Sequence, residues 1–204
     1  MQNLHVQLYS PNWLLFVRFD TIVNTADESI EDLSLSHISP WADPELGNWI
    51  RMQASTGDTS SIGWACSRYW DVAHIRAQTW ARCVRAHSEL VVDIHSPQDS
   101  SSGSENSEPD DLSRSTLHSH LGRSSMTFSQ RGVAVKIVWI IGFDWTGEVE
   151  SRVSATAAFP TKWRGIDERR SLDKVGKLFD ALVAARGVYE AVRILLGVIF
   201  ARDV

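Results

Sequence analysis

The chain has 204 residues, 43% of them hydrophobic and 22% charged, with a formal net charge of −5. A chain of this size and composition can bury a core of its own, so we expect one folded domain, or one domain with an appendage. Residues 98–111 hold five acidic residues and no Lys or Arg, which leaves the rest of the chain formally neutral. A neutral body argues against a dedicated nucleic-acid surface, because phosphate binding needs clustered cations.

The composition also bears on the compartment. No run of about 18 apolar residues occurs, and the N-terminus lacks the basic-then-apolar pattern of a secretory signal. We therefore expect an intracellular protein, nuclear or cytoplasmic, without a membrane partner. Cys66 and Cys83 stand 17 residues apart in one predicted helix, beyond disulfide reach, so we expect reduced thiols. Because a strand pattern starts as early as Leu4, a longer natural N-terminus is an open alternative.

The first part of the chain, 1–96, is predicted to form a strand hairpin followed by a long helix. Apolar residues alternate over 4–8, turn residues follow at 10–12, and a second apolar run begins at Trp13. A short extended piece and a short helix opened by Pro44 come next. From 60 to 90, apolar residues recur at helical spacing, which predicts one buried helix face. That face comprises Cys66, Tyr69, Trp70, Ala73, Ala77, Trp80, Ala81 and Val84.

The middle segment, 97–131, is rich in Ser, Asp, Glu, Asn and Gly. This composition predicts a disordered acidic insertion, because it offers too little apolar surface to offset the entropy of ordering. Ser102 and Ser107 are each followed three residues later by an acid, the pattern that acidophilic kinases use. Both are candidate phosphorylation sites, and the added charge could dock the insertion onto an arginine cluster.

The last part, 132–204, is predicted to form a long hairpin and a helix pair. Residues 133–141 alternate but are apolar throughout, which predicts a strand buried on both faces. Gly147 is available for the positive φ of a hairpin turn, and 149–159 returns as the partner strand. Two helical patterns, 168–186 and 188–201, follow with only Gly187 between them, so we expect a helix hairpin.

These elements predict an α+β fold. The hairpins 4–23 and 133–159 are each too small to be stable alone, so we expect them to join as one antiparallel sheet of about four strands covered by helices. Residues 1–96 and 132–204 would then form one folded domain with the insertion looping out. The alternative is two small domains, each with its own hairpin and helices.

The C-terminal part, with two strands, Pro160 at the exit and two closing helices, resembles the end of an RWD-type module. Such modules, found in several inner-kinetochore and chromosome-segregation subunits, have a four-stranded antiparallel meander flanked by helices and act as non-catalytic docking units. The resemblance covers about 70 residues and concerns architecture, so it transfers no functional residue. It implies a docking role in a nuclear, kinetochore-like complex.

Candidate catalytic and metal-binding residues are sparse. Cys83 and His87 are an i, i+4 pair on the tryptophan-rich helix, and His118 and His120 flank a single residue. Neither pair has the third group that a metal site or an activated nucleophile requires. No phosphate-binding glycine loop and no nucleophile elbow occurs. We expect no cofactor, no metal and no catalytic residue, and we leave the question of enzyme activity open.

Nine tryptophans are spread along the chain, and most of them should be core residues. Trp41, Trp49, Trp145 and Trp163 stand in turns or at element ends beside polar residues, where an exposed indole would anchor a protein partner. The alternative is that these four cap the ends of the sheet.

Three functions are compatible with these patterns. The first is a non-enzymatic adaptor that binds a protein partner in a hetero-complex. The second is a small enzyme or ligand-binding protein with a pocket between the tryptophan-rich helix and the sheet, using Cys83 and His87. The third, nucleic-acid binding beside Trp163, has the right residue types but too few cations: Arg164, Arg169, Arg170 and Lys174.

Overall fold

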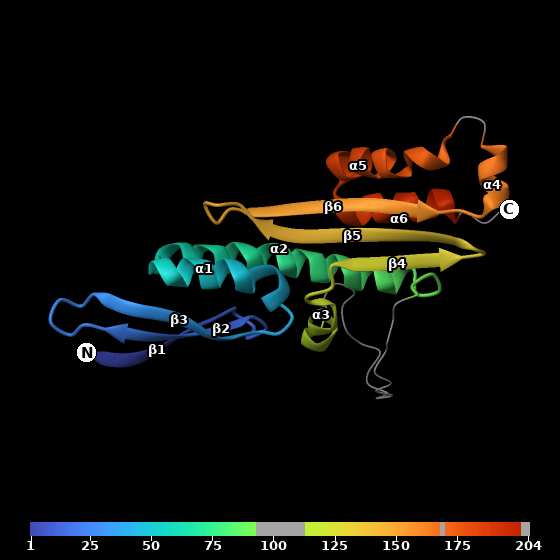
Figure 1. Cartoon of the computed structure of the whole chain (residues 1–204). Helices are drawn as coiled ribbons and strands as arrows, with labels where there is room; N and C mark the ends of the chain where they lie inside the picture. The colour runs from blue at the N-terminus through green and yellow to red at the C-terminus, as the bar shows by residue number, and fades with distance from the viewer. Residues whose placement is uncertain (93–112, 168–169, 201–204) are drawn as a thin grey trace. The chain divides into compact units, whose positions relative to one another are not determined.

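The structure is a computed structural model, and it describes residues 1–92, 113–167 and 170–200 (Figure 1). It is an α+β protein with two antiparallel three-stranded sheets. The chain divides into two compact units, each of which draws on both halves of the sequence. The first unit contains Met1–Ala77 and Ile140–Arg152, and the second contains Gln78–Trp139 and Val153–Val204.

The sheet of the first unit has the order β1-β2-β3. Its strands are β1 (Gln2–Tyr9), β2 (Phe16–Val23) and β3 (Ile30–Ile38). The predicted first hairpin is therefore confirmed, and the short extended piece after it is a full third strand. Trp13, with φ of 55°, closes the turn between β1 and β2 by donating its backbone N–H to the carbonyl of Ser10 at 2.9 Å.

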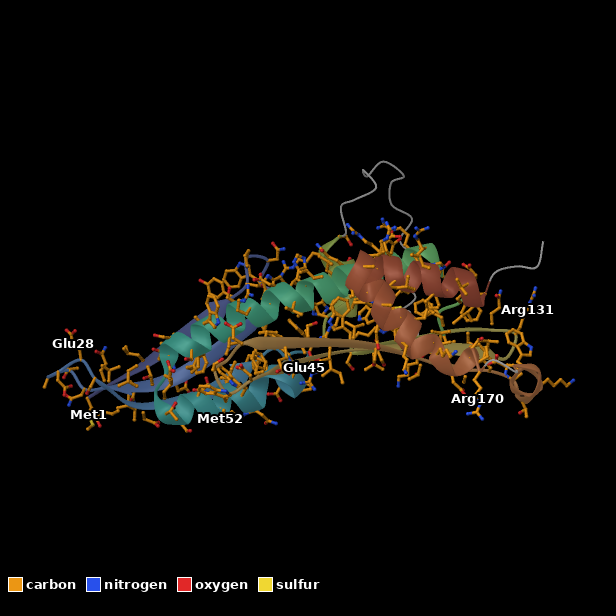
Figure 2. All side chains as sticks on the ribbon, turned by 90° about the horizontal axis from the view of Figure 1, so that it is seen from above. Met1, Glu28, Glu45, Met52, Arg131 and Arg170 are labelled. Atoms are coloured by element: carbon orange, nitrogen blue, oxygen red, sulfur yellow. The ribbon has the colours of Figure 1, made fainter. Side chains whose placement is uncertain are left out.

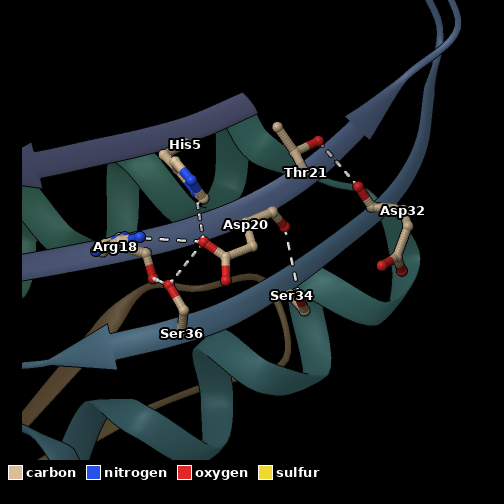
Figure 3. Close-up of polar contacts among 7 residues, drawn as sticks. All are labelled: His5, Arg18, Asp20, Thr21, Asp32, Ser34 and Ser36. Atoms are coloured by element: carbon tan, nitrogen blue, oxygen red, sulfur yellow. Dashed lines mark hydrogen bonds and ion pairs between the residues drawn. The ribbon is translucent and has the colours of Figure 1, made fainter. Parts of the chain in front are cut away.

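One face of this sheet is apolar and the other is polar, as the period of two in a strand requires. Val17 and Phe19 of β2 are buried, and they share their face with Leu8 and Val6 of β1, the residues opposite them in the register. Figure 3 shows the other face, where His5 from β1, Asp20 from β2 and Ser36 from β3 lie together. The Asp20 carboxylate accepts hydrogen bonds from His5 at 2.8 Å and from Ser36 at 3.2 Å.

Helices cover the apolar face. A π-helical turn, η1 (Asp43–Gly47), leads into α1 (Asn48–Thr56), with proline in its first turn as predicted. The left-handed Gly57 then ends α1. The long helix α2 (Thr59–Ala86) confirms the strongest periodicity in the sequence, because Tyr69, Ala73, Ala77 and Trp80 are all buried.

The second unit begins its sheet in the segment predicted to be disordered. Residues 113–131 are folded: they form α3 (Arg114–His120) and β4 (Ser125–Gln130), so the predicted insertion is too long at its C-terminal end. The physical reason is apolar burial, since Leu117, Met126 and Phe128 are all buried. Residues 97–112 of the predicted insertion lie outside the described residues.

The long C-terminal hairpin is confirmed as β5 (Val133–Phe143) and β6 (Val149–Ala158). Gly147 has φ of 88°, the left-handed conformation that the turn requires. The prediction that β5 is buried on both faces is wrong. Val135 and Ile137, which point to one face, are buried. Lys136 and Ile140, which point to the other face, are exposed.

The chain closes with α4 (Thr161–Ile166), the short 3-10 helix η2 (Leu172–Lys174), α5 (Val175–Arg186) and α6 (Val188–Ile199). Gly187, with φ of 78°, separates α5 from α6, and the two helices pack as the predicted hairpin. Their apolar residues join the core of the second unit with Trp80, Phe128 and Ile137.

The two predicted hairpins do not form one four-stranded sheet. Each instead gains a third strand from its own neighbourhood in the sequence, β3 for the first and β4 for the second. Alternating burial shows which face of a strand is covered, but it carries no information about which strand lies beside it.

Candidate binding groove

The structure divides the four tryptophans that the sequence suggested as partner anchors into two pairs. The indole N–H of Trp41 donates to the carbonyl of Leu14 at 2.9 Å, and its ring stacks on Tyr69. Trp49 is buried, and its indole N–H donates to the carbonyl of Asp144 at 3.3 Å. Both are core residues of the first unit, so they do not offer a free indole to a partner.

The other pair is exposed. Trp145 stands at the tip of the β5–β6 turn with 87% of its surface exposed, and Trp163 on α4 is 45% exposed. Sequence reasoning missed two more exposed indoles, Trp13 at 61% and Trp64 at 52%. A signal existed for both: Trp13 directly follows turn residues, and Trp64 falls off the buried periodic face of α2.

Trp163 is the exposed tryptophan that lies beside a groove. Strand β6 ends at Ala158, and Pro160 caps α4, with its carbonyl accepting the backbone N–H of Trp163 at 2.9 Å. This short turn stacks the ring of Trp163 on Phe159, with ring centroids 6.1 Å apart. The aromatic pair forms one wall.

Asp167 holds the opposite wall in place. Its two carboxylate oxygens accept backbone N–H groups from Leu172 at 2.7 Å and from Ser171 at 2.9 Å. These hydrogen bonds, the one from Leu172 first, lower the pKa of Asp167. Figure 2 labels Arg170, the residue before Ser171, which has φ of 51°. These hydrogen bonds therefore hold Leu172, the first residue of η2, at a defined position ahead of α5.

Gly176 lets α5 lie close to β6. A Cβ atom at this position would stand 3.3 Å from the carbonyl oxygen of Ala155, a tight contact that a small shift of the helix or the strand would have to relieve. Helix α6 then closes the floor with the buried Leu195. The result is a groove of about 580 Å³, which we call the α5–α6 groove. Its lining residues are Phe159, Trp163, Ser171, Leu172, Lys174, Val175, Lys177, Leu178, Leu195, Val198 and Ile199.

The groove is apolar with a basic component. Val198 is 64% exposed and Leu178 is 44% exposed, although both lie on helices whose other faces are buried. Among the described residues of the lining, the charged ones are Lys174 and Lys177. An apolar surface with two ammonium groups suits a ligand that is apolar in part and negatively charged in part.

The pair Cys83 and His87 does not form a reactive site. Cys83 is buried, and burial raises the pKa of its thiol to about 12, so the thiolate does not form near neutral pH. Burial also lowers the pKa of His87, whose ring lies edge-on to Phe128. Cys66 is similar to Cys83, with a pKa raised by burial to about 12.

The cavities between α2 and the first sheet are smaller than the α5–α6 groove. One of about 200 Å³ is lined by Leu8, Tyr9, Cys66, Trp70 and neighbouring residues. A second, of about 140 Å³, lies beside it and shares Leu8 and Gly63. Both volumes are below the range of about 300–1,000 Å³ that is usual for small-molecule sites.

The described residues form no cluster of three metal-ligating side chains. On α3, His118 is exposed and His120 is buried. Desolvation lowers the pKa of His120, with Arg123 adding to the effect. Ser102 and Ser107 lie outside the residues that the structure describes, so their candidate role as phosphorylation sites stays a prediction.

One buried polar network was missed by sequence reasoning. Arg76, whose side chain is fully buried, donates two hydrogen bonds of 2.7 Å to the carboxylate of Glu45. The same carboxylate accepts the Tyr69 hydroxyl at 3.0 Å and the backbone N–H of Ile141 at 3.3 Å. Arg76 falls on the periodic apolar face of α2, and a charge in that position was the available signal.

The network ties η1, α2 and the C-terminal end of β5 together within the first unit, and Figure 2 labels Glu45. Burial, with the Glu45 carboxylate second, raises the pKa of Tyr69. Because Glu45 has its oxygens engaged by three other groups, we interpret this network as structural and not catalytic.

Comparison with protein-family models and with curated protein sequences finds no match to this chain. Among the described residues, no helix is both long enough and apolar enough to cross a bilayer.

Proposed function

We propose that this chain is a non-enzymatic adaptor that binds a protein partner in the α5–α6 groove. The observation that carries the proposal is the groove itself: about 580 Å³, lined by apolar side chains, with Trp163, Leu178 and Val198 all more than 40% exposed. Exposed apolar surface of this kind marks binding sites in proteins that otherwise bury such residues. A tryptophan at its wall is the residue type that most often dominates binding energy.

The chemistry of the groove favours an amphipathic helix with acidic residues as the bound segment. An open groove between helices accepts a helix whose apolar side chains recur at i, i+3 or i+4 and i+7. Lys174 and Lys177 would then pair with carboxylates at the edge of that helix. These exposed pairs would contribute mainly to orientation and to the rate of association.

The finer form of the proposal concerns the complex. The C-terminal hairpin and the closing helices α5 and α6 resemble the end of an RWD-type module, a docking unit of inner-kinetochore subunits. A nuclear, kinetochore-like complex is therefore one setting for the adaptor, and a cytoplasmic complex is the other. The phosphorylation of Ser102 and Ser107 would regulate either one.

The alternative is a small enzyme or ligand-binding protein with a pocket between α2 and the first sheet. It has less support, because the two cavities there are small and Cys83 is a buried, protonated thiol. It predicts that a small molecule, and not a protein, raises the melting temperature of the purified chain.

The adaptor is tested by affinity purification of the tagged full chain at near-native level, with co-purifying proteins measured by mass spectrometry. We compare the wild type with Val198→Glu, which places a carboxylate in the groove, and with the control Ile75→Glu. Ile75 is also a β-branched, helical residue and is 54% exposed, so the change is chemically matched. The partner should fall at least about tenfold for Val198→Glu and stay constant for the control.

Charge reversal supplies a second comparison. Lys177→Glu should weaken capture of the same partner, whereas Lys136→Glu, at an exposed position of β5 outside the groove, should not. A wild-type chain that elutes alone, or one whose partners survive Val198→Glu unchanged, would contradict the proposal.

A further inference from the structure

The two sheets of this protein have four edge strands, and three of them carry features that block pairing with another chain. An edge strand exposes unpaired backbone N–H and C=O groups, so proteins protect it with charges, irregularities or a covering segment. In the first sheet, β3 carries Glu31 and Asp32, and its register with β2 shifts twice. This edge is therefore charged and irregular.

Both edges of the second sheet are also protected. The segment 90–92 covers β4: Val92 donates its N–H to Thr127 at 3.1 Å, and Leu90 accepts the N–H of Ser129 at 2.7 Å. Strand β6 carries Glu150 and Arg152, whose side chains form an ion pair of 2.6 Å.

Among the residues that the structure describes, strand β1 shows none of these features. It pairs with β2 over eight consecutive residues, Gln2–Tyr9, with no shift in register. It contains no Lys, Arg, Asp, Glu or Pro, and all its residues but Leu8 are exposed. Its histidine, His5, is already hydrogen-bonded to Asp20 on the polar face (Figure 3). A long, regular and uncharged edge is the type that adds another strand.

The apolar face of the first sheet is incomplete at this edge. Leu4 and Val6 belong to the buried face by register, but they are 39% and 43% exposed. The cavity of about 140 Å³ opens beside Val6 and Leu8, over Ile62 and Gly63 of α2. A further strand with apolar residues at alternate positions would cover Val6 and continue the face.

We propose that β1 binds β1 of a second copy of this chain, antiparallel, to form a symmetric dimer with a continuous six-stranded sheet. The argument for a second copy is that β1 is itself the kind of strand that its edge would accept. It has eight residues, it alternates apolar and polar side chains, it carries no Lys, Arg, Asp or Glu, and no described segment pairs with its outer edge. In a two-fold pairing centred on Val6, Leu4 of each copy lies opposite Leu8 of the other, all on the apolar face. No like charges meet, because the strand carries none.

The end of the strand adds aromatic surface to this interface. Tyr9 and Trp13 stack with centroids 4.2 Å apart and an angle of 8° between the rings. Both are more than half exposed, Trp13 in a left-handed conformation that is uncommon for a bulky residue. In the same pairing Tyr9 lies opposite Asn3 of the partner strand, so the aromatic pair covers each end of the paired strands.

The experiment is sedimentation velocity of the purified full chain from about 1 to about 100 µM, which spans the dissociation constants of common dimers. The wild type should shift from monomer to dimer over this range. Val6→Lys and Val6→Glu should each weaken dimerisation at least about tenfold, because like charges then face each other across the two-fold axis. An equimolar mixture of the two variants should recover a heterodimer, which a misfolded variant could not form.

The matched control is Ile140→Lys. Ile140 is also a β-branched strand residue of the first unit, and it is 53% exposed, but it lies on β5, in the other sheet. The control should dimerise like the wild type, and so should Val198→Glu, which separates this interface from the α5–α6 groove. A wild type that stays monomeric throughout the range would overturn the proposal. A strand of another protein would then be the remaining candidate to pair with β1. A dimer unaffected by both Val6 variants would also overturn it.

Discussion

The two units differ in what holds their cores together. The core of the first unit includes a buried ion pair, Glu45 with Arg76, whose side chains are 13% and 0% exposed. The core of the second unit is built from apolar side chains such as Trp80, Phe128 and Phe179, all fully buried. In both units helices pack on a three-stranded sheet, but the stability of the two cores should respond differently to substitution.

This difference shows how strictly each core fixes the arrangement of its helices and strands. Apolar packing depends on volume, and a core can accept another apolar residue of similar size at small cost. A buried charge requires its partner, because removing one member leaves the other in a medium that solvates it poorly. The first unit is thereby committed to one arrangement of η1 against α2, whereas the second relies on shape.

Breaking the ion pair should have the largest effect. We expect Glu45→Ala to lower the free energy of unfolding by about 3–5 kcal/mol, because Arg76 loses a carboxylate that accepts two of its hydrogen bonds. Urea denaturation followed by tryptophan fluorescence measures this loss. The control is Glu150→Ala, which removes an ion pair of similar length, 2.6 Å, but exposed, and should cost less than about 1 kcal/mol.

A double variant sharpens the same comparison. Replacing both members, Glu45→Leu with Arg76→Met, should recover much of the stability lost in Glu45→Ala, since no charge is then buried. A double variant as unstable as the single one would show that the geometry of the network, and not the charge of Arg76, sets the cost.

Two glycines with positive φ give the second comparison, one from each unit. Gly147 has φ of 88°, and a Cβ atom there would lie 2.8 Å from Cζ2 of the buried Trp49. Gly187 has φ of 78°, with nothing within 4 Å of the same position. We expect Gly147→Ala to cost about 2–3 kcal/mol and Gly187→Ala about 1 kcal/mol, measured by thermal and urea unfolding. Equal costs would mean that Trp49 yields to the added methyl group.

The smallest effects should come from two exposed turn carboxylates. Hydrogen bonds lower the pKa of Asp144, the Thr146 side chain contributing most, and they also lower the pKa of Asp167, Leu172 N–H contributing most. Each carboxylate therefore contributes stability above its unfolded pKa, and the contribution is lost as pH falls through the lower folded pKa. Carboxyl NMR titration should place both below the usual value of about 3.9.

A substitution separates these two turns. Thr146→Ala should raise the pKa of Asp144 toward its usual value and leave that of Asp167 unchanged. A pKa of Asp144 that does not move would assign its shift to the backbone N–H groups of Thr146 and Glu148 instead.

Local elements could be predicted from the sequence, and their partners could not. The periodicity of α2 and the turn at Gly147 are local signals, so these elements were found with nearly correct bounds. Sheet membership depends on contacts between distant segments, and two separate sheets satisfy the same alternation as one. The fold of residues 113–131 was missed because the prediction of disorder rested on the average composition of 97–131. That average is polar, although the segment contains the buried Leu117, Met126 and Phe128.

The candidate groove was predictable only in part, because its residues carry local signals but its shape depends on contacts between distant segments. Trp163 was identified from its position at an element end, but Leu178 and Val198 fell into helical patterns that predict core residues. A periodic pattern shows that a helix has an apolar face, without showing where the neighbouring elements stop covering it. The buried Arg76 was missed for the opposite reason, because arginine is usually assigned to solvent.

The interleaved division of the chain has a consequence for biosynthesis. The first unit requires Ile140–Arg152, because Ile141 belongs to its core and donates a backbone hydrogen bond to Glu45. A ribosome must therefore have reached Arg152 before this unit has all its parts, whereas domains usually fold as units while the chain emerges. During that interval strands β1 to β3 and α2 expose their apolar faces, so we expect nascent chains that end before Ile140 to bind chaperones.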